Sequence, residues 1–188
     1  MGVTISLSKR FRVCVIVLAL LPVLGCSEIN KTNSPVELIA TAQQNVSVID
    51  LLNLPTANIG TIEVRAISKR TDADPTFMDV KLKSYRVSYQ RTDGGTLVPE
   101  PFTRTTSGLV PVNGSGTALD DFVLVQPGAL IQAPFAALYA SAGGVDPETG
   151  QSLVKMDAIV DIFGETLAGE DVSARVRIPL WFCAGCSQ

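Results

Sequence analysis

The sequence contains no histidine among its 188 residues, and only one tryptophan and four cysteines. Without histidine the chain has no Ser-His-Asp or Cys-His nucleophile pair, no histidine metal ligand and no imidazole proton shuttle. This deficit excludes a large share of hydrolase and metalloenzyme chemistry. We therefore expect a protein that is not an enzyme and that carries no cofactor or metal.

Basic residues are also few, with 15 Lys and Arg against 18 Asp and Glu. A surface that binds nucleic acid needs clustered basic side chains. The densest basic group, Lys81, Lys83 and Arg86, follows one alternating segment in the manner of a solvated strand face. The composition therefore argues against a nucleic-acid partner.

The amino-terminal segment has the pattern of an export signal. Lys9, Arg10 and Arg12 precede the twelve apolar residues from Val13 to Leu24, which is the order of regions in a secretory signal peptide. A helix that spans a membrane needs about 20 apolar residues, so this run is too short. We expect a helical signal peptide over residues 1–25, whose removal changes the formal charge from −3 to −6.

The end of the apolar run, Val23-Leu24-Gly25-Cys26, resembles the lipobox of bacterial lipoproteins. The resemblance implies cleavage before Cys26, a thioether link from its sulfur to diacylglycerol, and acylation of the new amine by a fatty acid such as palmitate. Two acyl chains anchor a protein stably to a bilayer. Ser27 stands where lipoproteins retained in the inner membrane carry Asp, which implies the outer membrane.

The remaining chain divides into a tether and one domain. Residues 26–34 indicate a lipidated tether, because the sequence after Cys26 is polar and lacks periodicity. Residues 35–188 indicate a single domain, since about 150 residues suffice to bury a core without disulfide support.

Two alternating segments near the carboxyl end predict an antiparallel hairpin. They are Leu153 to Phe163 and Val172 to Phe182, joined by Gly164 to Asp171. The residues expected to face inward are Val154, Met156, Ala158, Val160 and Ile162 on the first, and Val172, Ala174, Val176, Ile178, Leu180 and Phe182 on the second.

Further strands are predicted upstream. Val80 to Gln90 alternates with a slip of phase at Lys83-Ser84, which predicts a bulge, and Asp93-Gly94 then predicts a hairpin turn. Weaker strands are expected at Val36 to Thr41, Val46 to Leu51, Thr61 to Ser68 (with Ile62, Val64 and Ala66 inward), Phe102 to Thr105, Leu109 to Val112 and Thr117 to Val125. Gln126 to Ala142 lacks alternation, and Pro134 is expected to open one short helix there.

Seven to nine short strands with almost no helix predict an all-β fold, specifically an antiparallel immunoglobulin-like β-sandwich. A closed barrel is the alternative. Pro179 argues against it, because a proline inside the last strand lacks an amide donor and suits a sheet edge. The body also resembles the exported immunoglobulin-like domains of bacteria, which implies an architecture and no particular activity.

Cys183 and Cys186 form the most specific motif of the predicted domain. Haem attachment needs a histidine after the second cysteine, where Ser187 stands, and a thioredoxin-type dithiol needs a helix after the first. We expect a disulfide that closes a small loop in an oxidising compartment. Free or redox-active thiols, and a metal shared between two copies, remain the alternatives.

Acidic residues in turns raise a second class of function. The groups are Asp72 with Asp74, Asp120-Asp121, and Asp146 with Glu148. Calcium prefers six to eight oxygen ligands, which loops at one end of a sandwich can pool. The simpler interpretation is turn chemistry, in which Asp side chains bind nearby backbone amides.

A carbohydrate platform would need an exposed aromatic ring, and Trp181 is the candidate because it lies out of phase with the inward row. The hypothesis that leads is a lipid-anchored envelope protein with a non-enzymatic structural or interaction role. It has a membrane partner through its lipid and an envelope protein as a further partner. Calcium or carbohydrate binding is the alternative, followed by thiol redox chemistry at Cys183 and Cys186.

Overall fold

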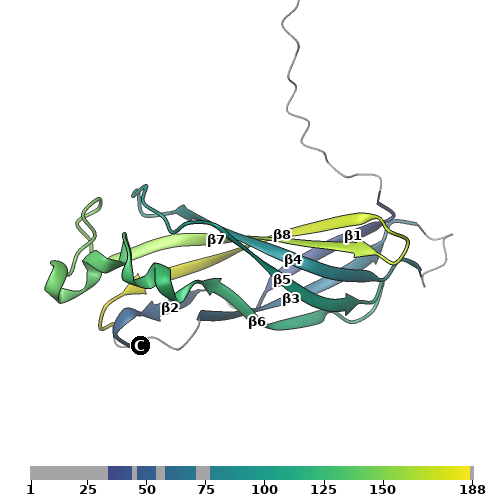
Figure 1. Ribbon diagram of the computed structural model, residues 1–188, viewed down its shortest axis with the longest axis horizontal. Helices are drawn as coiled ribbons and strands as arrows, with labels where there is room; N and C mark the ends of the chain where they lie inside the picture. Colours follow the sequence, from purple (N-terminus) through teal and green to yellow (C-terminus); the bar gives the residue numbers. More distant parts are fainter. Residues whose placement is uncertain (1–33, 44–45, 54–57, 71–76, 187–188) are drawn as a thin grey trace, which may run out of the picture. The chain divides into compact units, whose positions relative to one another are not determined.

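The chain is described by a computed structural model that covers residues 34–43, 46–53, 58–70 and 77–186 (Figure 1). The expected signal peptide, Cys26 and the tether before Ser34 lie outside the described residues. Within the described part, one hydrophobic core joins all the strands.

Eight strands form two packed sheets, so the predicted all-β, sandwich-like fold is confirmed (Figure 1). The first sheet has the order β1-β3-β6 and the second has the order β2-β8-β7-β4-β5. The strands are β1 (Val36–Ala42), β2 (Ser47–Asp50), β3 (Asn58–Ser68), β4 (Val80–Arg91), β5 (Phe102–Val110), β6 (Thr117–Val125), β7 (Leu153–Thr166) and β8 (Asp171–Cys183).

The core lies between the facing sides of the sheets and is built from alternate residues of each strand. The predicted inward row of β7 is at most 1% exposed, and every predicted inward residue of β8 is buried except the half-buried Val176. Across the layer, the ring of Tyr85 on β4 stacks on Phe122 of β6 at 3.8 Å between centroids. The hydroxyl of Tyr89 donates to the carbonyl oxygen of Leu124 at 2.7 Å. These contacts tie one sheet to the other.

The predicted bulge in β4 is confirmed. Its pairing with both neighbours shifts register between Leu82 and Ser84. The extra residue moves Tyr85 onto the same inner face as Leu82, because side chains otherwise alternate strictly along a strand. Both side chains are consequently buried, at 3% and 1% exposed.

The predicted hairpin of β7 and β8 is confirmed in a longer form. Their register runs from Leu153 opposite Cys183 to Glu165 opposite Asp171. The strands therefore continue through half of the segment that was expected to be the turn.

The strands around β5 differ from the prediction. Phe102 to Thr105 and Leu109 to Val112 were expected as two strands, but β5 is continuous to Val110, and Val112 only bridges Ala66 of the other sheet. The Asp93-Gly94 turn does not close a tight hairpin either, because residues 92–101 separate β4 from β5. The antiparallel pairing of β4 with β5 nevertheless forms.

The expectation of wholly antiparallel sheets was wrong at one place. β2 pairs with β8 in parallel, placing Ser47 opposite Leu180 and Asp50 opposite Cys183. Pro179 lies just before this ladder begins, at the last position where β7 is the only sheet neighbour of β8. The proline therefore occupies a stretch of sheet edge, as predicted, while the end of β8 is interior.

Between β6 and β7 the chain forms short 3₁₀ helices. They are η5 (Pro127–Ile131), η6 (Phe135–Leu138) and η7 (Ala140–Ala142), and a further turn, η3 (Leu51–Asn53), follows β2. The predicted helix after Pro134 corresponds to η6, whose Phe135 is fully buried against Phe182 of β8 at 4.2 Å between ring centroids. This segment closes one end of the core.

Phe182 and Phe163 provide a direct test of this core. Replacing the fully buried Phe182 with Ala is expected to lower the free energy of unfolding by about 3–5 kcal/mol, because it removes packed atoms and leaves a cavity. Phe163→Ala is the control, since this ring is 40% exposed, and it should cost less than about 1 kcal/mol. Urea denaturation of both variants measures the difference, and equal losses would contradict the assignment of faces.

Candidate functional site

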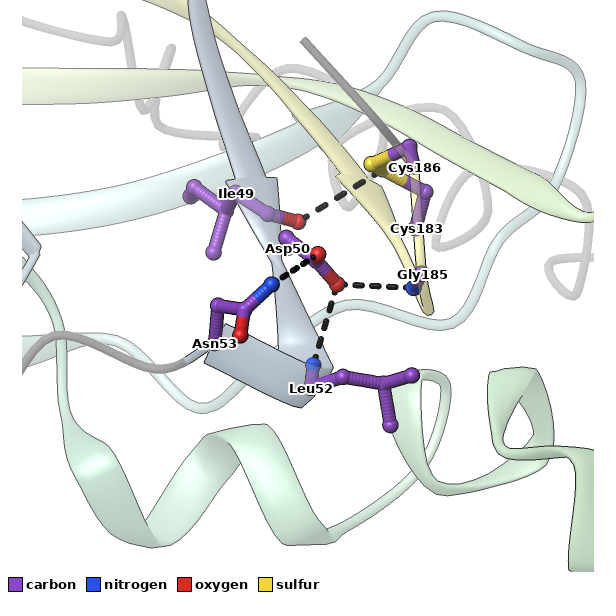
Figure 2. Close-up of a disulfide and its surroundings, with 7 residues drawn as sticks. All are labelled: Ile49, Asp50, Leu52, Asn53, Cys183, Gly185 and Cys186. Carbon is purple, nitrogen blue, oxygen red and sulfur yellow. Dashed lines mark hydrogen bonds between the residues drawn. A yellow bond between two sulfur atoms is a disulfide. The ribbon is translucent and has the colours of Figure 1, made fainter.

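Cys183 and Cys186 are joined by a disulfide at the carboxyl end of β8 (Figure 2). Their Cα atoms are 5.9 Å apart, a separation that suits a disulfide. Cys183 is 5% exposed, and its sulfur lies 3.8 Å from the carbonyl oxygen of Ile49 on β2. The bridge therefore sits against the neighbouring strand as well as closing its own loop.

Asp50, the last residue of β2, connects this loop to the rest of the chain (Figure 2). Its carboxylate accepts hydrogen bonds from the amide of Gly185 at 2.7 Å and the amide of Leu52 at 3.0 Å. The side-chain amide of Asn53 donates to its other oxygen at 2.8 Å. The amide of Gly185, followed by that of Leu52, lowers the pKa of Asp50 below its ordinary value.

Gly185 makes this contact in a backbone conformation that favours glycine. Its φ is +76°, and a Cβ atom there would lie 3.2 Å from Leu52 Cδ1. The loop from Cys183 to Cys186 is thus shaped to present one amide to Asp50. The disulfide and the hydrogen bond from Gly185 to Asp50 together connect the ends of β2 and β8, and we call them the disulfide latch.

A second cluster lies at the base of the loops and was not anticipated from the sequence. The side chain of Arg91, at the end of β4, is 2% exposed and binds two carboxylates. It forms a bidentate pair with Asp93 at 2.7 and 2.9 Å, and its Nη2 lies 2.7 Å from Asp146 Oδ2. Its Nη1 also donates to the carbonyl oxygen of Leu97 at 3.2 Å.

The acids around Arg91 hold the backbone of two loops. Asp93 accepts from the amide of Lys155 at 2.8 Å and from Gly95 at 3.2 Å. Glu148 accepts from the amides of Thr96 and Leu97, both at 2.8 Å. Residues 92–101 are in this way fastened to the turn that precedes β7.

Burial opposes ionisation of Asp93 and Asp146, but hydrogen bonds from Arg91 outweigh it. The pKa of each carboxyl lies below its ordinary value, helped by the amide of Lys155 for Asp93 and by Thr149 for Asp146. The same two carboxylates raise the pKa of Arg91 despite its burial. All three groups therefore stay charged at neutral pH.

The calcium candidates among the described residues form no common site. Asp72 and Asp74 lie outside the described residues, and Asp120 and Asp121 lie within β6 rather than in a turn. Within residues 34–186, leaving aside the undescribed gaps, no group of three or more acids or cysteines is placed to hold a metal ion.

Asp146 lies at a turn and accepts a hydrogen bond from the nearby amide of Thr149, as the simpler interpretation predicts. Glu148 instead binds the distant amides of Thr96 and Leu97, and both acids pair with Arg91, which that interpretation does not predict. The guanidinium of Arg91 thus supplies the positive charge at this cluster.

Trp181 and the basic group on β4 are exposed to solvent. Trp181 is on the outer face as expected, 37% exposed, but the ammonium of Lys155 lies 5.0 Å from its ring centroid and covers one side. Lys81, Lys83 and Arg86 are all exposed on β4, and Lys83 pairs with Glu165. The prediction of a solvated strand face is therefore confirmed.

No family model, no curated protein and no solved structure matches the chain. Among the described residues, no helix is long and apolar enough to cross a membrane.

The disulfide latch is testable by removing its two parts separately. Cys183→Ser with Cys186→Ser should lower the free energy of unfolding by about 2 kcal/mol, because the bridge closes only a very short loop. Hydrogen exchange should accelerate at Gly185 and along β2. Asp50→Asn keeps the bridge and should accelerate exchange at Gly185 and Leu52 alone. Unchanged exchange in both variants would contradict the latch.

The Arg91 cluster predicts a dependence of stability on pH. Because the folded-state pKa values of Asp93 and Asp146 lie below the ordinary 3.8, their contribution is complete above that value. It is lost as the pH falls through the folded-state values, since the unfolded chain takes up protons first.

Arg91→Met should lower the free energy of unfolding at pH 7 by about 3–5 kcal/mol, because it leaves buried carboxylates without their partner. It should also weaken the acid dependence. Arg175→Met, which removes an exposed partner of Asp161, is the control and should cost less than about 1 kcal/mol. Urea titrations between pH 2.5 and 7 measure both effects, and equal costs would refute the cluster's structural role.

Proposed function

We propose that this chain is a bacterial lipoprotein whose β-sandwich is held at a membrane by lipid on Cys26. The observation that carries the proposal is the boundary Gly25-Cys26 after a basic segment and a short apolar run, followed by an ordered domain that begins at Ser34. The eight residues from Ser27 to Ser34 would span at most about 26 Å if fully extended. The domain then works within a few nanometres of the bilayer surface, and Ser27 favours the outer membrane.

The order of the strands supports an immunoglobulin-like assignment of the sandwich. In that fold one sheet contains strands A, B and E, and the other contains G, F, C and, in some members, C′. Here β1-β3-β6 and β8-β7-β4-β5 have the matching sequence order. The domain departs from antibody domains in lacking cysteines on β3 and β7 and in carrying its tryptophan on the last strand. The assignment concerns architecture and carries no activity.

A structural or interaction role fits the way the domain uses its buried charges. In this cluster Arg91 donates hydrogen bonds to Asp93 and Asp146, and Asp93 also accepts one from a backbone amide. Such bonds fix the shape of the loops at one end of the sandwich. A rigid set of loops and an open sheet edge near a membrane would suit contact with another envelope protein without catalysis.

Lipidation of Cys26 is the decisive test. In a bacterial host that processes lipoproteins, the mature protein should begin at Cys26, carry the mass of a diacylglycerol and an amide-linked acyl chain, and partition into detergent. Cys26→Ser should abolish the added mass and release the protein into the aqueous phase, while Cys183→Ser should leave lipidation intact. A mature protein with an unmodified first residue, or one cut elsewhere, would refute the proposal.

A further inference from the structure

A hollow of about 450 Å³ opens between the free edges of the two sheets. Its walls are residues 104–107 of β5 and 118–120 of β6, and Tyr85 and Phe122 form its floor. The two strands meet near their connection, where the hydroxyl of Thr117 donates to the carbonyl oxygen of Leu109 at 3.3 Å. Farther from that point their edges separate, whereas on the opposite flank β1 packs beside β8.

Of the devices that usually protect an exposed strand, which are prolines, charges, bulges and short length, the edge of β5 has one charge and one shift of register against β4. It runs for nine residues without proline, and its only charged side chain is that of Arg104. The other free edges of the described strands are acidic, short or interrupted by proline. Among the described strands, β6 carries Asp120 and Asp121, β1 carries Glu37 in its seven residues, and the free part of β8 carries Pro179.

Arg104 is the only charged side chain of β5, and the hollow beside it is also lined by Asp120 of β6. Arg104 lies opposite Tyr85 in the register of β4 and β5, and Tyr85 points inward, so Arg104 borders the hollow. It is exposed and has no ion pair within the described part of the chain. On the outer face, the neighbouring strand β4 adds the exposed Lys81 and Arg86.

We propose that the edge of β5 accepts an extended, acidic peptide segment of a partner protein as an additional strand. The unpaired backbone groups of β5 supply the hydrogen bonds, as in other cases of strand addition. An acidic side chain that points inward from the added strand meets Arg104 in the hollow. The overall negative charge of the chain is screened within about 8 Å at physiological salt. An added strand pairs directly with β5, whose only charged side chain is that of Arg104, whereas Asp120 belongs to the opposite wall of the hollow.

A second copy of this chain is a poorer occupant. Antiparallel pairing of two β5 edges would bring two Arg104 side chains to one interface, with the basic residues of each β4 behind them. Like charges that face each other across a sheet oppose pairing.

The test uses three labelled nine-residue peptides and the full chain. The first alternates Glu with Thr and Val, the second has Lys in place of Glu, and the third is the Glu peptide with two central prolines. Fluorescence anisotropy should show that the Glu peptide binds at least ten-fold more tightly than either of the others. Arg104→Glu should reverse the preference in favour of the Lys peptide, whereas Lys69→Glu, an equal change of charge at the end of β3, should not.

Amide hydrogen exchange on the unaltered chain provides a readout that needs no variant. The Glu peptide should slow exchange along β5 and leave β1 unchanged. Equal binding of the proline peptide would show charge attraction without strand addition, and would overturn the proposal. So would the absence of binding by the Glu peptide, or sedimentation that shows self-association abolished by Thr105→Lys.

Discussion

The fold depends on burying alternate side chains of β4, β7 and β8 against β3 and β6. Because side chains alternate with a period of two, a slip of one residue would turn an entire apolar row toward water. The bulge between Leu82 and Ser84 is the place where β4 meets this constraint. It keeps Leu82 and Tyr85 on one face, and Tyr85 can then stack on Phe122 of the other sheet.

The periodic strands could be predicted from the sequence because one face of each is exposed to solvent and the other is buried in the core. β7, β8 and β4 carry this signal, and even the slip at Lys83-Ser84 in β4 is visible in it. β5 was divided in two because an edge strand needs no apolar alternation, and Thr103 to Ser107 offers none. The parallel pairing of β2 with β8 was missed because its partners lie more than 130 residues apart, and no local pattern records such a contact.

The candidate sites show the same difference between local patterns, which the sequence indicates, and distant contacts, which it does not. The spacing of Cys183 and Cys186 is local and was recognised, whereas the role of Asp50 depends on the distant pairing of β2. Asp93 was interpreted only as part of a turn with Gly94. Its ion pair with Arg91 was not predicted. Asp146, the other carboxylate bound by Arg91, lies 55 residues from it in the sequence, so no local pattern indicates the contact. Asp146 and Glu148, two of the acidic residues that suggested a metal site, instead pair with the guanidinium of Arg91.

The first two strands, β1 and β2, belong to different sheets, and this affects how the domain resists a pulling force. A pull that arrives from the side of Ser34 is borne first by the seven register pairs of β1 with β3, and then by the four pairs of β2 with β8. Asp50, the last residue of β2, stands at the far end of this load path. A force would have to strip β1 from its sheet and open the ladder of β2 before it reached the hydrogen bond from Gly185 to Asp50, so this bond is loaded last.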